Sequence, residues 1–503
     1  MSKNKKLKFV LFVLLAVVIA AFPACTRQDA NKDAPELRYG FTTEPPTLDP
    51  LSPRDTADSR SILFNVFEGL VKPNHEGRLL PCIAESWTVE QDGLVYIFTI
   101  RQGVSFHDGS TVTTDDVKFS LDTATAAGFS GMDRIEEVKI TGENQVTVTL
   151  KSPDPEFLPF ITTGIVKADN EDREKNIIGT GPFYIESYTT QRNLVLRKFD
   201  DYWNPSLPHL EKVTIVFLAN SDALMVALRG GGIDGASITG SMAAQLDHRN
   251  FDMFHSYSSA VQLLALNNAA APLDDMRVRL ALNYGIDVQN IIDTAFFGMG
   301  VPSGSPIIPG LSVYYEASLS YPYNPETAKA LLAEAGFGEG RRFSLEITVP
   351  SNYLMHVDTA QVIVNQLEKI DVDASIKLVD WNTWYEDVYR GRHYQATIVS
   401  LDSATVSPRS FLNRYRSGNG SNFINFSNAD FDRVFDTLLL ETDEERRIRL
   451  YREAQHVIAE NAASVYIQDI LYYKAMRAGM FAGVLSYPLY AIDFASIYRI
   501  NKN

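Results

Sequence analysis

Cysteine is almost absent from this chain of 503 residues, which contains only Cys25 and Cys82. Two cysteines cannot form the disulfide framework of a small secreted domain, and they cannot alone ligate zinc or an iron–sulfur cluster. The eight histidines are scattered and lack the spacing of a metal site. We therefore expect neither a disulfide scaffold nor a metal centre, and no cofactor.

Basic residues are outnumbered, because 46 Lys and Arg stand against 62 Asp and Glu and leave a net charge of −16. Proteins that bind nucleic acid usually carry a basic patch and have a high isoelectric point, so a nucleic-acid partner is not expected. The apolar share of 45% and the charged share of 21% are typical of a soluble folded protein. The length predicts two or three globular units.

Familiar catalytic motifs are also missing, including Gly-x-Ser-x-Gly, His-Glu-x-x-His and Cys-x-x-Cys. His107 and Asp108 are neighbours in an expected turn, where adjacent side chains point in different directions. The glycines at 230–232 follow a helical pattern and lack the Lys-Ser/Thr of a phosphate-binding loop. The sequence thus predicts a binding protein and not an enzyme.

Only one long apolar run is present, at residues 9–22, directly after a segment with four lysines. The run is shorter than the ~20 residues that a membrane-spanning helix needs, and a basic start followed by such a run is typical of a secretory signal. Small residues then precede Cys25, and this arrangement resembles a bacterial lipoprotein signal. The resemblance implies removal of residues 1–24 and diacylation of Cys25.

The match to the lipoprotein signal is incomplete, because Phe22 and Pro23 depart from the usual residues before the cysteine. A signal cleaved without lipidation and an uncleaved anchor helix are the alternatives. Loss of residues 1–24 leaves 42 basic and 62 acidic residues, a net charge of −20. Residues 25–36 are polar and predict a tether that holds a folded unit at a membrane surface. Cys82 is expected to be a buried free thiol.

Beyond the tether, segments that alternate apolar and polar residues are interspersed with segments of helical pattern, which predicts α/β architecture. The pattern predicts strands at residues 94–101, 145–150, 194–199, 213–218 and 374–379. It predicts helices at 115–122, 222–229, 328–335 and 359–370, and one or two long helices at 431–463. Thr113 or Thr114 is expected to cap the first of these helices.

Six stretches, in order, resemble the large extracytoplasmic solute-binding proteins of peptide and nickel ABC importers, solute-binding protein family 5. The most specific stretch is FTIRQGVSFHDGSTVTTDDVKFSL at residues 98–121. The others are EPPTLDP at 44–50, FEGL at 67–70, LPCIAESW at 80–87, and longer blocks at 179–218 and 266–287. Together they cover most of the chain after the signal.

The resemblance implies an α/β, two-lobed periplasmic-binding-protein clamp of type II, with an extra subdomain, mixed β-sheets and a hinge. Lobe I would comprise residues 37–264 and the returning segment 473–503, and lobe II would comprise residues 265–472. The lobes would close over a ligand. The closed, loaded receptor would then engage a membrane permease. No signal for oligomers is visible, and a monomer is expected.

In peptide-binding members, an acidic residue of lobe II pairs with the α-ammonium of the peptide. The matching stretch here is SLDSATVSPRSFL at residues 400–412, in which Ala404 occupies the position of the usual acid and Leu401 that of the usual Trp. Asp402 lies two residues earlier, on the same face of a strand and displaced by ~6.6 Å. Either Asp402 binds the ammonium, or it is a surface carboxylate and the ligand is anionic, neutral or a metal chelate.

The resemblance also implies other ligand contacts. Trp381 is expected to contact ligand, the alternative being packing against the core, which is the interpretation for Trp384. Arg390 could hold a ligand carboxylate or be solvated surface. Ser400 and Leu401, which directly precede Asp402, are expected to contact ligand as well. In lobe I, Thr43 and Glu44 lie where family members offer backbone to the ligand, although Glu44 could simply end its strand.

The leading hypothesis is therefore a lipid-anchored receptor that captures oligopeptides or dipeptides at the periplasmic or extracellular face of a bacterial membrane and delivers them to an ABC permease. A receptor for a nickel chelate, an oligosaccharide or another small solute is the alternative within the same clamp. A surface adhesin is the alternative from a different class. A hydrolase is disfavoured because no catalytic motif is present.

Overall fold

The structure is a computed structural model that describes residues 35–500 except 55, 339, 403–405 and 490, and that leaves the side chains of 256–259 undescribed. By its contacts, the chain from Glu36 to Asn503 forms one compact unit. The predicted signal, Cys25 and Ala404 lie outside the described residues. Among the described residues, no helix is long and apolar enough to cross a membrane.

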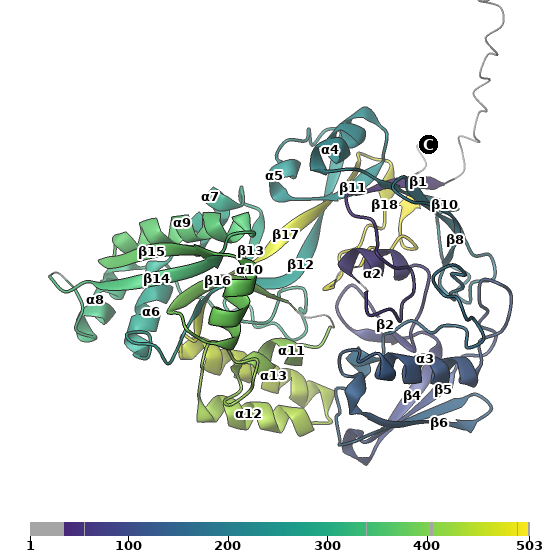
Figure 1. The fold of residues 1–503 in the computed structure, drawn as a ribbon, viewed down its shortest axis with the longest axis horizontal. Helices are drawn as coiled ribbons and strands as arrows, with labels where there is room; N and C mark the ends of the chain where they lie inside the picture. Colours follow the sequence, from purple (N-terminus) through teal and green to yellow (C-terminus); the bar gives the residue numbers. More distant parts are fainter. Residues whose placement is uncertain (1–34, 55, 339, 403–405, 490, 501–503) are drawn as a thin grey trace, which may run out of the picture. The chain divides into compact units, whose positions relative to one another are not determined.

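One mixed sheet of eleven strands organises this unit (Figure 1). Its strand order is β15-β14-β16-β12-β17-β11-β1-β10-β9-β8, and β13 pairs with β17 beside this path. The strands are β1 (Glu36–Phe41), β8 (Phe183–Thr189), β9 (Asn193–Lys198), β10 (Lys212–Phe217), β11 (Gly235–Ile238), β12 (Phe251–Leu266), β13 (Gly300–Pro302), β14 (Phe343–Pro350), β15 (Val372–Val379), β16 (Ala396–Asp402) and β17 (Ser464–Arg477). The α/β prediction is confirmed.

The two longest strands, β12 and β17, run antiparallel through the middle of this sheet. The last seven residues of β12 pair with β16, whereas residues 473–476 of β17 pair with β11. The β12–β17 ladder shifts register between Tyr257 and Val261, which marks a bulge where a strand bends. Both predicted crossings between lobes I and II, after Leu264 and before Tyr473, fall within these two strands.

The lobe II part of the sheet contains a parallel unit of β14, β15 and β16. Helix α9 (Leu354–Glu368) connects β14 to β15, and α10 (Trp381–Thr383) with the π-helical turn η4 (Trp384–Arg390) connects β15 to β16. Ile363 and Leu367 of α9 pack with Leu345 and Ile347 of β14 in one apolar core. The carboxyl ends of the three strands therefore meet at one edge of the sheet.

The other helices of this half cover the rest of its core. They are α6 (Met276–Gly285), α7 (Val288–Ala295), α8 (Pro325–Glu334), α11 (Arg409–Leu412), α12 (Ala429–Leu440) and α13 (Glu444–Glu460). Helices α12 and α13 resolve the prediction of one or two long helices at 431–463 in favour of two. Their apolar faces pack Phe431, Phe435 and Ile458 together.

A separate antiparallel sheet lies within the lobe I segment, in the order β4-β5-β7-β6. Its strands are β4 (Ala84–Glu90), β5 (Val95–Ile100), β6 (Ile135–Gly142) and β7 (Gln145–Leu150), and α3 (Thr114–Ala126) packs beside it. The predicted cap of α3 is confirmed at Thr113, whose side chain accepts from Asp116 N while the Asp116 carboxylate accepts from Thr113 N.

Short elements complete the lobe I segment: β2 (Val71–Pro73), β3 (Leu79–Pro81), α2 (Ala57–Leu63), α4 (Ser221–Gly230), α5 (Gly240–Ala243), β18 (Phe481–Ala482) and β19 (Tyr498–Arg499). Gly231 ends α4 in the left-handed conformation, with φ of 79°. The glycines at 230–232 thus serve a helix C-cap, as their position after a helical pattern predicted.

A buried ionic contact joins the lobe I and lobe II segments of the unit. Arg409 of α11 donates two hydrogen bonds to the carboxylate of Asp154, at 2.7 and 2.8 Å, and Arg134 donates a third at 2.8 Å. Two residues further on, Glu156 accepts from Tyr451 of α13. Burial alone would raise the pKa of Asp154, but the bonds and charge of Arg409 outweigh it and lower that pKa.

We predict a large loss of stability when one side chain of this ionic contact is replaced. Asp154→Asn should lower the free energy of unfolding by about 3–5 kcal/mol, because it leaves Arg409 buried without its counter-charge. Urea unfolding measures the effect. The exposed pair Arg433–Asp430 is the control, since Arg433→Met should change stability by about 0.5 kcal/mol or less. Equal effects of the two changes would refute the structural role of Asp154.

His107 is half-buried and connects two stretches of the chain through hydrogen bonds. Its Nδ1 accepts from Gly179 N at 3.2 Å, and its Nε2 lies 3.0 Å from the carbonyl oxygen of Gly181, to which it donates. Burial lowers its pKa to about 4, partly offset by the bond to Gly181. The pKa of buried His356 in α9 is also lowered to about 4 by burial. His107 therefore holds the turn at 103–110 in place and belongs to the fold.

Because the pKa values of these two histidines are lowered, we predict that the protein loses stability in mild acid. Their folded pKa lies below the unfolded value of 6.5, so the stabilisation is complete above pH 6.5 and is lost as the pH falls towards 4, by about 3 kcal/mol for each histidine. His107→Gln should flatten the pH dependence of the unfolding free energy between pH 6.5 and 4. An unchanged slope would show that His107 is not buried in its neutral form.

Candidate functional site

The carboxyl edge of the parallel strands in lobe II carries an exposed aromatic surface, which we call the aromatic shelf (Tyr353, Trp381 and Tyr385). Tyr353 follows β14 and Trp381 follows β15, with ring centroids 5.6 Å apart. All three side chains are exposed. Ligands of open α/β sheets bind outside the carboxyl ends of the strands, so this edge is a candidate ligand surface.

The two tryptophans of this connection differ in burial. Trp381 is 41% exposed and stacks on Trp384, with centroids 5.0 Å apart and planes at 16°. Trp384 is 3% exposed, and its indole N–H donates to Thr397 at 2.9 Å. The interpretation of Trp384 as a core residue is confirmed. Trp381 presents its remaining surface to solvent, where a ligand can contact it.

Strand β16 ends at the same edge with Ser400, Leu401 and Asp402. The Asp402 side chain is exposed, and among the described residues its carboxylate has neither a hydrogen bond nor an ion pair. Its carbonyl oxygen accepts from Arg414 Nη2 at 3.0 Å. The Ser400 hydroxyl is buried and has no partner among the described residues. Both polar side chains therefore have unused capacity to bind.

One backbone edge of β16 is also unpaired towards the end of the strand. Residues 396–402 pair with β12 on one side, but only Ala396 and Thr397 pair with β14 on the other. For residues 398–402, no ladder partner is described on the β14 side. Ile398 and Val399 are buried there, Ser400 and Leu401 are half-buried, and Asp402 is exposed. Backbone N–H and C=O groups at such an edge can accept an added strand.

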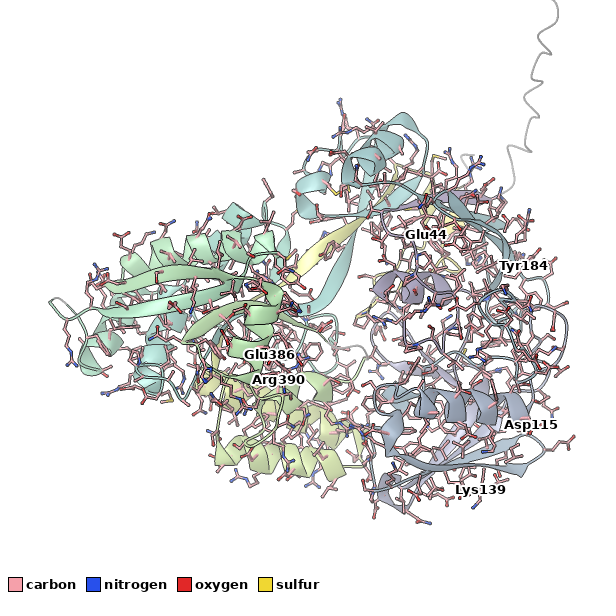
Figure 2. The ribbon with its side chains drawn as sticks, viewed as in Figure 1. Glu44, Asp115, Lys139, Tyr184, Glu386 and Arg390 are labelled. Atoms are coloured by element: carbon pink, nitrogen blue, oxygen red, sulfur yellow. The ribbon has the colours of Figure 1, made fainter. Side chains whose placement is uncertain are left out.

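Arg390 lies away from this edge. Its Nη1 is 3.3 Å from both carboxylate oxygens of Glu386, and both side chains are exposed (Figure 2). Because η4 leads from the end of β15 back to the start of β16, Arg390 is separated from Asp402 by nearly the length of a seven-residue strand, roughly 20 Å. The structure does not bring Arg390 together with the other predicted site residues.

In lobe I, the segment after β1 carries the other predicted residues. Thr43 is exposed. Glu44 is bound to the β8–β9 hairpin, because its Oε1 accepts from the Tyr188 hydroxyl at 2.6 Å and from Gln191 N at 2.9 Å. A ligand ammonium at Glu44 would have to compete with these two donors.

Two cavities flank helix α2 on the lobe I side. The first, which we call the Lys474 cavity, measures about 270 Å³ and is lined by residues of β1, α2 and β17 and by Leu489, Ala491 and Ile492, with Thr42, Asp58, Tyr472 and Lys474 among its polar members. The second, the Lys72 cavity, measures about 440 Å³. Its lining includes Arg60, Lys72, Phe64, Phe129 and Phe160. The sequence pattern did not reveal either cavity, because each is assembled from distant segments.

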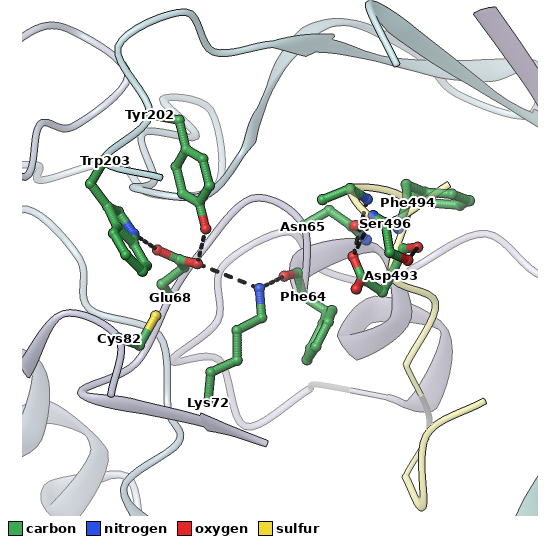
Figure 3. Close-up of polar contacts among 12 residues, drawn as sticks. Phe64, Asn65, Glu68, Lys72, Cys82, Tyr202, Trp203, Asp493, Phe494 and Ser496 are labelled. Atoms are coloured by element: carbon green, nitrogen blue, oxygen red, sulfur yellow. Dashed lines mark hydrogen bonds and ion pairs between the residues drawn. The ribbon is translucent and has the colours of Figure 1, made fainter. Parts of the chain in front are cut away.

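Lys72 is held by a buried polar cluster (Figure 3). The carboxylate of Glu68 accepts from the Tyr202 hydroxyl and the Trp203 indole N–H, both at 2.6 Å, and lies 3.4 Å from Lys72 Nζ. Cys82 lies beside this cluster as a buried free thiol, as predicted, and burial raises its pKa. The charge of Lys72 is therefore already compensated within the protein.

The Lys474 cavity and the end of β16 belong to neighbouring strands of one sheet. Leu401 pairs with Val261 of β12, and Val261 pairs with Asp469 of β17. Lys474 lies five residues along β17 from Asp469, about 16 Å at the usual rise of a strand, and two strand spacings of about 4.8 Å separate β16 from β17. The two places are therefore roughly 19 Å apart, and an extended peptide needs about six residues to reach both.

Comparison with known proteins agrees with these features. The family model described as "Bacterial extracellular solute-binding proteins, family 5 Middle" matches residues 78–423. The glutathione-binding protein GsiB of Salmonella typhimurium is 29% identical over 472 residues, which cover 88% of this chain and 89% of that protein. Heme-binding protein A of Haemophilus influenzae is 27% identical over 425 residues, covering 76% and 77% of the two chains.

A solved structure shares the fold. The periplasmic murein tripeptide binding protein MppA, in its unliganded open form, superposes with a TM-score of 0.85 at 21% identity and covers 93% of this chain and 98% of its own. At this identity the likeness concerns the fold alone, and it confirms the predicted architecture.

Because Trp384 is buried and Trp381 is exposed, we predict that replacing them by alanine has different effects on stability. Trp384→Ala should lower the free energy of unfolding by about 3–5 kcal/mol, because it opens a cavity in the core. Trp381→Ala should lower it by about 1 kcal/mol or less and act on ligand binding instead. Chemical unfolding of both variants provides the comparison. A loss of several kcal/mol in Trp381→Ala would mean that Trp381 is a packing residue.

Proposed function

The chain belongs to family 5 of the bacterial extracellular solute-binding proteins, and from that premise we propose that it is the peptide receptor of an ABC importer. In this proposal it captures oligopeptides or dipeptides, small forms such as glutathione among them, between lobes I and II. A membrane permease then receives the loaded receptor. The family consists of binding proteins for transport, which fits the lack of catalytic motifs in the sequence.

The unpaired backbone edge of β16 carries the peptide assignment. An extended peptide can pair with the backbone at residues 400–402, which gives affinity through main-chain hydrogen bonds. At the end of this edge, the exposed carboxylate of Asp402 can accept a charge-assisted bond from the peptide α-ammonium. Trp381 supplies an apolar surface for a side chain. Asp402 would thus replace the acid that peptide-binding members carry at position 404.

The aromatic shelf favours a second candidate within the same clamp. Planar ligands stack on exposed aromatic rings, and heme-binding protein A is among the relatives. A heme or a metal chelate could therefore lie against Trp381 and Tyr353. Among the described residues, no cluster of three or more His, Cys, Asp and Glu side chains could hold a bare metal ion.

The place of action follows from the N-terminal sequence. We infer that residues 1–24 direct export and that Cys25 carries the lipid, so that the receptor stays at the periplasmic or extracellular face of the membrane as a monomer. Residues 25–36 would then provide the reach to meet the permease.

The proposed function is tested by identifying what the protein carries. Native mass spectrometry of residues 26–503, followed by denaturing release, should yield peptide masses. Isothermal titration with glutathione and trialanine then measures affinity. Release of a single non-peptide mass, such as a heme or a metal chelate, together with no binding of either peptide, would reject the peptide assignment in favour of the second candidate.

If Asp402 binds the peptide α-ammonium, its replacement should cause a specific loss of peptide affinity. Asp402→Ala should weaken a peptide with a free α-ammonium by about 1.5–3 kcal/mol, because a charge-assisted hydrogen bond is lost. The N-acetylated form of the same peptide is the control and should bind both proteins equally. Equal affinity of the free peptide for the two proteins in calorimetry would remove Asp402 from the site.

A further inference from the structure

The Lys474 cavity contains a buried cation whose charge the protein itself does not pair. Lys474 is 2% exposed, and its ammonium donates to the carbonyl oxygen of Leu485 at 2.6 Å. An ammonium has three donors, and this is the only hydrogen bond that the described residues provide. No carboxylate of the described residues lies within ion-pair distance. A buried charge without a partner is costly, so such groups mark candidate binding sites.

The surroundings of Lys474 supply little compensation. Burial lowers its pKa to about 8, and the charge of Asp493 offsets this only in part. Asp493 is occupied by the Tyr487 hydroxyl at 2.9 Å and by Ala495 N at 3.0 Å. At neutral pH Lys474 is thus still protonated, in a cavity whose other charged lining residue, among those described, is Asp58 of α2.

Lys72 provides an internal comparison. Both lysines line cavities beside α2, but Lys72 lies 3.4 Å from the buried carboxylate of Glu68, which neutralises it. Among the described residues, Lys72 therefore has a counter-ion within ion-pair distance and Lys474 has none. The difference indicates that the counter-ion of Lys474 comes from outside the chain.

We propose that Lys474 anchors a carboxylate of the ligand in the cavity formed by β1, α2 and β17. This inference rests on the proposed function and specifies it further: the ligand class is a peptide with a free C-terminal carboxylate, which enters this cavity while the remainder of the ligand extends towards β16. Thr42 and Ser237 line the same cavity and can donate hydroxyl hydrogen bonds to that carboxylate. Asp58 on the α2 wall would repel a second carboxylate, so the acid is directed to Lys474.

The test compares trialanine with trialanine amide, which differ in the charged carboxylate, by titration calorimetry. The wild-type protein should bind the acid roughly 10- to 100-fold more tightly than the amide, the range expected for a charge-assisted bond. In Lys474→Met this preference should fall to about threefold or less, with little change for the amide. Lys474→Gln, which keeps a donor without the charge, should behave similarly and guards against a failure of the first variant to fold.

Lys72→Met is the matched control and should keep the preference for the acid. Loss of the preference in Lys72→Met and not in Lys474→Met would overturn the inference. Equal binding of acid and amide by the wild type would overturn it as well, while leaving the peptide receptor intact. Failure of the wild type to bind trialanine, its amide and glutathione would instead reject the proposed function together with the inference that depends on it.

Discussion

The pairing of β12 with β17 is the constraint on which the rest of the unit depends. Every interior strand of a sheet must satisfy its backbone groups on both sides, and these two strands do so by pairing with each other and with strands of both lobes. The register shift near Tyr257 gives the pair a place to bend without loss of the ladder on either side. A clamp whose halves share one sheet can thus move while both cores stay intact.

The cations inside this acidic protein are satisfied in two ways, some by a carboxylate and others by carbonyl oxygens. Arg409 and Lys72 are each withdrawn from water beside a carboxylate, Asp154 and Glu68 respectively. These pairs join segments that are distant in sequence, and they are best understood as contacts that specify the fold. Buried Arg279 and Lys474 have no carboxylate among the described residues within ion-pair distance. The Arg279 guanidinium donates to four carbonyl oxygens, those of Leu273, Asp274, Asn461 and Ala462, whereas the Lys474 ammonium donates to the carbonyl oxygen of Leu485 alone. Because Lys474 also lines a cavity, its charge is the one that carries information about a ligand.

The regular elements were predictable from the sequence wherever one face meets solvent. Strands β5, β7, β9, β10 and β15 and helices α3, α4 and α9 fall within a few residues of the predicted ranges, because alternating or amphipathic patterns report one buried face. The pattern did not reveal β12 and β17. Much of β17 is buried on both faces, so its apolar residues form an almost continuous run without alternation. Similarly, nothing in the sequence indicated that Glu44 binds the β8–β9 hairpin.

The sequence by itself determined the family, the α/β class and the stretch at 400–412, because these depend on local patterns and on the order of motifs. Only the tertiary structure decided that Trp381 is exposed, that Arg390 lies at the far end of β16, and that Lys474 is buried without a counter-charge. These properties are set by which distant segments pack together. A side chain has no burial or partner until the chain around it has folded.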